Sequence, residues 1–173
     1  LVKAQHNWAE VQEKVKVVGR ETGRVADAEK LLAQLDTQWN AVQAQVAKAH
    51  RKPRVLFVLA HSGSPQVAGR GTAANALIQY AGCVNAIDQF DGYKPLTAEA
   101  MASAAPEVII NTTQGIEALG GELAFWKRPE LALTPAFAKK ALVTLEASHL
   151  LGFGPRLPTA VQALHMRSLQ WVA

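Results

Sequence analysis

Cysteine and long apolar runs are scarce in this 173-residue sequence. Cys83 is the only cysteine, so an intrachain disulfide and any metal site built from several cysteines are excluded. Its apolar neighbours indicate a small buried side chain. No apolar run approaches the length of a membrane-spanning helix, and no signal peptide is predicted at the start. Because the chain opens within a helical pattern and without methionine, we expect a processed or truncated polypeptide.

Charge of either sign is also limited. Charged residues make up 18% of the sequence and hydrophobic residues 49%, which is typical of a globular protein with one sizeable core. The net charge of +4 includes the cluster Arg51-Lys52-Pro53-Arg54 at a predicted helix-to-strand junction. No aromatic residue interleaves with this cluster, and such clusters are usually solvated helix ends. The sequence therefore predicts no nucleic-acid partner.

The first 50 residues have the apolar spacing of helices. One stripe begins at Trp8, and Gly23 is expected to end its helix. A second, heptad-like stripe spans residues 25–46 and includes Leu32, Leu35 and Trp39. A long helix laid against an α/β body is the favoured interpretation. A helical adaptor that associates through this stripe is an alternative.

From residue 54 onward, short apolar runs alternate with helical patterns. We predict strands at 55–60, 84–87, 108–110 and 142–145, and helices at 72–81, 97–104 and 158–171, with short helical pieces at 115–125 and a turn at 91–95. This alternation predicts an α/β fold, a parallel sheet with helices on both faces, preceded by a long helix. The helical segment would cover residues 1–53 and the α/β lobe residues 54–173.

Two loops carry the candidate binding residues. His61 directly follows the first buried strand, and ligands of open α/β sheets bind where strands end. The second loop, residues 150–156, lies between the last strand and the last helix. Its glycines permit close approach of the backbone, Phe153 offers an aromatic face, and Arg156 offers a positive charge.

A dinucleotide-binding enzyme is the alternative in another functional class. Gly69-x-Gly71-x-x-Ala74 matches the dinucleotide fingerprint, and Asp88 follows a strand where a ribose-binding acid would lie. However, the fingerprint requires its first glycine in the turn directly after the strand, and here several residues intervene, including Pro65. No nucleophile elbow, converging carboxylate pair or metal-ligand histidine spacing is present. His149 and the other histidines are interpreted as ordinary residues.

Six segments together resemble the substrate-binding proteins of bacterial haem ABC importers, whose two lobes are joined by one long helix. They occur in family order and are residues 55–61 (VLFVLAH), 68–74 (AGRGTAA), 92–96 (GYKPL), 105–109 (APEVI), 131–135 (LALTP) and 151–156 (LGFGPR). The first 50 residues match the inter-lobe helix more loosely. The N-terminal lobe, which usually carries a haem-ligating tyrosine, is absent, so the resemblance implies a C-terminal lobe plus the connecting helix.

The resemblance implies a periplasmic protein that binds haem, delivers it to an ABC permease and ATPase, and catalyses nothing. Arg156 and Arg70 would bind haem propionates, or Arg156 would hydrogen-bond an axial tyrosinate; Phe153 would contact the haem ring. His61 would ligate the iron or only line the pocket. Glu99 would dock on the permease. Without the other lobe, we expect the chain to bind haem weakly and to self-associate through its exposed apolar stripe.

Overall fold

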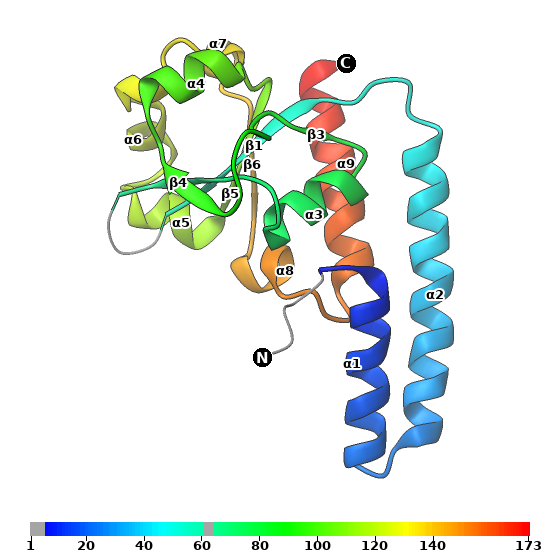
Figure 1. Cartoon of the computed structure of the whole chain (residues 1–173). Coiled ribbons are helices and arrows are strands. Elements are labelled where there is room, and N and C mark those ends of the chain that lie inside the picture. The colour runs from blue at the N-terminus through cyan, green and yellow to red at the C-terminus, as the bar shows by residue number, and fades with distance from the viewer. Residues whose placement is uncertain (1–5, 61–63) are drawn as a thin grey trace.

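The computed structural model describes residues 6–60 and 64–173. The chain opens with a helical hairpin of α1 (Trp8–Glu21) and α2 (Val25–Ala47), drawn in blue and cyan in Figure 1. Asn7 caps α1 by accepting a hydrogen bond from the backbone N–H of Glu10. Gly23 adopts φ of +69° between the two helices, as expected for a glycine that ends a helix. Both predicted helices are confirmed.

The centre of the remaining chain is a parallel sheet. Strand β1 (Arg54–Leu59) pairs with β5 (Val108–Thr112), which pairs with β6 (Leu142–Leu145). The short β3 (Val84–Asn85) pairs in parallel with the first two residues of β1. All four strands were predicted, because runs of apolar residues buried on both faces are typical of parallel sheets.

The sheet is mostly parallel, as predicted, and two short antiparallel strands extend it. Strand β2 (Gln66–Ala68) runs antiparallel to β1, and β4 (Tyr93–Pro95) runs antiparallel to β2, giving the order β4-β2-β1-β5-β6. The sequence indicated a loop and a turn at these positions. Both strands have only three residues, too few to show a period of two, and Pro95 is tolerated because β4 lies at the edge of the sheet.

Helices cover both faces of the sheet, as predicted. In Figure 1, α3 and α9 lie on the side of the hairpin, and α4, α6 and α7 lie on the other side. Threonines cap α3 and α4, and Thr97 is the predicted cap of α4. The remaining bounds are α3 (Ala73–Tyr80), α4 (Ala98–Ala104), α5 (Thr113–Ala118), α6 (Glu122–Trp126), the 3₁₀ helix η1 (Pro129–Leu131), α7 (Pro135–Lys139), α8 (Ala147–Leu151) and α9 (Leu157–Val172). Within the described ranges, no helix is long and apolar enough to cross a membrane.

An aromatic cluster joins the hairpin to the lobe. The Trp8 and Trp39 rings stack with centroids 4.7 Å apart, and Tyr80 of α3 meets Trp39 edge-on at 4.8 Å. The Tyr80 hydroxyl also accepts a hydrogen bond from the backbone N–H of Trp8 at 3.1 Å. The long helix therefore packs on the α/β body, which was the favoured interpretation of its apolar stripe. The division of the chain at residues 53 and 54 stays a prediction.

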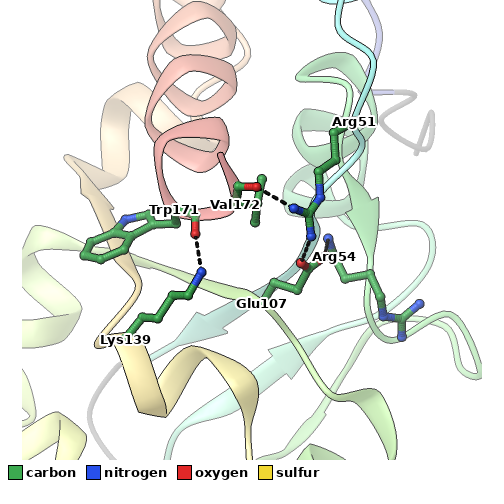
Figure 2. Close-up of polar contacts among 6 residues, drawn as sticks. All are labelled: Arg51, Arg54, Glu107, Lys139, Trp171 and Val172. Atoms are coloured by element: carbon green, nitrogen blue, oxygen red, sulfur yellow. Dashed lines mark hydrogen bonds and ion pairs between the residues drawn. The ribbon is translucent and has the colours of Figure 1, made fainter.

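The basic cluster around Arg51 makes internal contacts at the amino ends of the parallel strands (Figure 2). The Arg51 guanidinium donates to the Glu107 carboxylate at 2.6 Å and to the backbone carbonyl of Val172. The backbone N–H of Arg54 donates to the other Glu107 oxygen at 3.1 Å, and Lys139 donates to the carbonyl of Trp171 at 3.1 Å. Arg51 and Lys139 therefore bind the last backbone carbonyl groups of α9. The cluster is exposed to solvent, as expected, and it also forms a junction that fixes α9 to the linker after α2.

Candidate functional site

Strands β1, β5 and β6 are parallel, so their carboxyl ends meet at one edge of the sheet. We call this the carboxyl edge. Ala60, residues 111–114, residues 146–149 and Arg156 form its described part. His61 follows Ala60 in the sequence but lies outside the described residues, so its proposed contact with iron stays a prediction. Ligands of open α/β sheets bind at such an edge.

Short hydrogen bonds fix the backbone where β5 meets α5. Asn111 is fully buried, and its Oδ1 accepts a hydrogen bond from the N–H of Thr112 at 2.7 Å. The Thr112 hydroxyl accepts from the N–H of Gly115 at 2.8 Å and caps α5. Gln114 links α5 to α8, because its Oε1 accepts from the N–H of Ala147 at 3.1 Å. The two loops of this part of the edge are therefore held in one arrangement.

The start of α9 contributes a chain of polar contacts. Arg156 is the residue before α9, and its carbonyl accepts a hydrogen bond from the Thr159 hydroxyl at 2.8 Å. The Nε2 atom of His149, on α8, lies 2.9 Å from the oxygen of the same hydroxyl. Burial first, and the positive charge of Arg156 second, lower the pKa of His149. Within residues 6–60 and 64–173, no carboxylate forms an ion pair with Arg156, whose exposed side chain is available to an anion.

Phe153 does not offer the expected aromatic face. Its side chain is only 3% exposed and its backbone adopts φ of +40°, which turns the side chain into the core. The His6 ring contacts it edge-on at 5.4 Å between centroids, and Lys14 donates to its backbone carbonyl at 3.2 Å. In addition, Leu150 and Leu151 belong to α8 rather than to the predicted loop. The glycine-rich loop therefore starts later and packs inward, because burying Phe153 is more favourable than leaving it in water.

Arg70 lies away from the carboxyl edge. Gln66 pairs with Leu59 at that edge, and β2 then runs back along β1, so Arg70 lies toward the amino end of β1. Its guanidinium forms an exposed ion pair with Asp91 at 3.1 Å. The structure thus does not bring Arg70 together with Arg156. Glu99 is exposed in the first turn of α4.

The glycines of the alternative nucleotide site have structural explanations. Strand β2 separates Gly69 from the end of β1, so no tight turn leads directly from β1 into a phosphate-binding helix. A Cβ atom on Gly69 would lie 2.4 Å from the carbonyl oxygen of Phe90. Gly71 adopts φ of +73°, and Asp88 is exposed. The dinucleotide fingerprint is therefore a chance match in this fold.

An apolar cavity of about 290 Å³ lies between the far end of the hairpin and the loop before α9. Its lining includes Val15, Val18, Leu31 and Pro155. Pro155 in this lining directly precedes Arg156 of the carboxyl edge. Across the described ranges, no group of three or more His, Cys, Asp and Glu side chains could hold a metal ion.

A family model described as a periplasmic binding protein matches residues 2–148. Among solved structures, the periplasmic haem-binding protein BhuT in complex with two haems is 42% identical, with a TM-score of 0.93 over 98% of this chain and 65% of its own. The periplasmic haem-binding protein RhuT from Roseiflexus sp. RS-1 is 31% identical, with a TM-score of 0.92 over 97% of this chain and 65% of its own. The periplasmic haem-binding protein HutB of Vibrio cholerae is 26% identical, with a TM-score of 0.80 over 98% of this chain and 66% of its own. The chain thus spans about 65% of the length of the first two relatives. No curated protein matches.

Proposed function

The chain belongs to the periplasmic binding protein family, and on that premise we propose that it is a haem-binding component of an ABC importer. It acts in the periplasm, delivers haem to the permease and ATPase, and catalyses no reaction. The observation that carries the proposal is the 42% identity to haem-bound BhuT over 98% of this chain. Strand β2 lies between β1 and α3, and this argues against the enzyme alternative, because the dinucleotide fingerprint requires its first glycine directly after the strand.

The carboxyl edge is the proposed haem site. Haem is a flat apolar ring that carries two carboxylates and an iron with open axial positions. Arg156 supports carboxylate binding, because its guanidinium has no acidic partner among residues 6–60 and 64–173 and can donate two parallel hydrogen bonds. His61, directly after Ala60, is the proposed axial ligand. The positions of Arg70 and Phe153 do not support a role for either in this site.

A hemin titration followed at the Soret band tests this site. Arg156→Ala is expected to weaken hemin binding about tenfold, the effect of losing a hydrogen bond to a charged group worth roughly 1.4 kcal/mol. His61→Ala is expected to lower the affinity and change the spectrum. Arg20→Ala, on the exposed far end of α1, and His50→Ala, before β1, are the matched controls. Unaltered affinity and spectrum in both site variants would remove His61 and Arg156 from the site.

Glu99 is the proposed contact with the permease. It is an exposed acid on α4, where Thr97 caps the helix, so Glu99 is not needed for capping. A negative charge at this position suits basic groups on the permease. Glu99→Arg should leave hemin binding unchanged and impair stimulation of the transporter ATPase. The control is Glu117→Arg, at an exposed position of α5, which should impair neither hemin binding nor ATPase stimulation. Normal stimulation by Glu99→Arg would exclude this contact.

We also propose that the 173-residue chain self-associates through the hairpin. Val18 is 59% exposed and Leu31 is 37% exposed, and both line the apolar cavity. Contiguous exposed apolar surface of this kind favours association.

A further inference from the structure

His149 occupies a position that its sequence context did not reveal. It belongs to α8, which begins two residues after β6 ends, so it lies at the carboxyl edge. Its neighbour Leu150 is completely buried in the core, whereas His149 keeps partial exposure. The histidine is therefore on the accessible side of a helix whose other side is anchored in the core.

The contacts of His149 define which ring nitrogen carries the proton. The Thr159 hydroxyl donates its single hydrogen to the carbonyl of Arg156 at 2.8 Å. The Thr159 oxygen must then accept from His149, whose Nε2 lies 2.9 Å away, so Nε2 is the protonated nitrogen. Nδ1 consequently bears a lone pair, and the backbone of Arg156 is a second hydrogen-bond partner of the His149 ring.

This arrangement is the one that prepares a histidine to bind a metal. Metal-ligating histidines typically donate their second ring N–H to a fixed acceptor, which sets the tautomer and the ring orientation. Here the fixed acceptor is Thr159, which is itself tied to the backbone of Arg156. Burial and the Arg156 charge also lower the pKa of His149, which favours the neutral imidazole that metals require. The nearby groups that act on its charge are Arg156, Glu146 and Arg167.

We propose that Nδ1 of His149 is an axial base for haem iron at the carboxyl edge, independent of His61. The inference rests on the proposed haem-binding function. In this arrangement, Arg156 serves two purposes: its backbone carbonyl ends the hydrogen-bond chain that orients His149, and its guanidinium binds a haem carboxylate. Helix α8 and the residue before α9 thus supply an iron ligand and an anion-binding group, respectively.

The competing explanation is that His149 only pins α8 to α9. His149→Gln separates the two, because a glutamine amide can still donate to Thr159 but provides no imidazole. Thr159→Val tests the orienting hydrogen bond, since it removes the acceptor and keeps the ligand. His50→Gln is the matched control, because His50 is exposed and lies before β1. Circular dichroism and thermal melting verify that each variant folds.

The readout is the ferric and ferrous absorption spectrum of the hemin complex, recorded in wild type and in a His61→Ala background. We expect histidine-ligated spectra to persist in His61→Ala and to disappear when His149→Gln is added. Hemin affinity should fall about tenfold in His149→Gln and less in Thr159→Val. A histidine-ligated spectrum and affinity that survive the addition of His149→Gln to His61→Ala would overturn the inference while leaving haem binding intact. Failure of wild type to bind hemin would instead overturn the proposed function, and the inference with it.

Discussion

Replacing Gly69 by alanine should destabilise the fold because of the close contact with Phe90. The added Cβ would lie 2.4 Å from the Phe90 carbonyl oxygen and 2.7 Å from its ring, distances that real Cβ atoms do not show. Phe90 would have to move by about 1 Å, which disturbs the hydrogen bond from the Arg70 N–H to its carbonyl at 2.8 Å. Overpacking together with a weakened hydrogen bond costs about 2–3 kcal/mol. For a chain of this length, the melting temperature should fall by about 5–10 °C.

Gly71→Ala is the matched comparison within the same loop. Its Cβ would meet nothing within 4 Å, and only the φ of +73° opposes the change. Alanine in this left-handed region costs about 1 kcal/mol, so its melting temperature should fall by only about 2–4 °C. Differential scanning calorimetry of both variants measures the difference. If Gly71→Ala were the more damaging variant, or if either change abolished a measurable nucleotide affinity, the packing explanation for Gly69 would be refuted.

Three further predictions concern the junction, the cysteine and the hairpin. Glu107→Gln should lower the free energy of unfolding, measured by urea denaturation, by about 1 kcal/mol. The reason is that the Glu107 carboxylate, at a partly exposed site, pairs with Arg51 and accepts a hydrogen bond from a backbone N–H. An unchanged free energy would show that the junction does not contribute to stability. Burial raises the pKa of Cys83 from 9.0 to about 11. Between pH 9 and 11 the thiol therefore stays protonated in the native state and ionises in the unfolded state, so the free energy of unfolding should fall as the pH rises through this range. Cys83→Ala should flatten that fall, and an unchanged profile would contradict it. Val18→Ser with Leu31→Ser should shift sedimentation toward monomer, and a monomeric wild type at high concentration would exclude self-association.

The sequence was sufficient for the elements that bury whole runs of apolar residues. The parallel strands and long helices were predicted because burial on both faces, or on one helical stripe, leaves a periodic pattern. Strands β2 and β4 were missed because three residues carry no period and their pairing depends on partners distant in the sequence. The missed β2 also misplaced Arg70, since a strand that runs back along β1 carries the residues after it away from the carboxyl edge.

The candidate site was predicted less completely than the fold. Arg156 was proposed as a site residue because its loop joins the last strand to the last helix, a relationship visible in the sequence, and its role stays a prediction. His149 was not proposed from the sequence, because its inferred role depends on the hydroxyl of Thr159 ten residues away and on which nitrogen carries the proton. Phe153 was wrongly expected to be exposed, since only the backbone φ of +40° reveals that the side chain turns into the core.

Paramagnetic broadening of backbone amide signals by ferric hemin tests the central claim most directly. The 18.6 kDa chain is small enough for such a map. Haem at the carboxyl edge should broaden most strongly the amides of residues 112–114, 146–150 and 156–159, and should broaden those at the turn of the hairpin, residues 19–28, less. Broadening centred on the hairpin cavity around Val18 and Leu31, with the carboxyl edge unperturbed, would show that hemin binds only to exposed apolar surface and would contradict the proposed site.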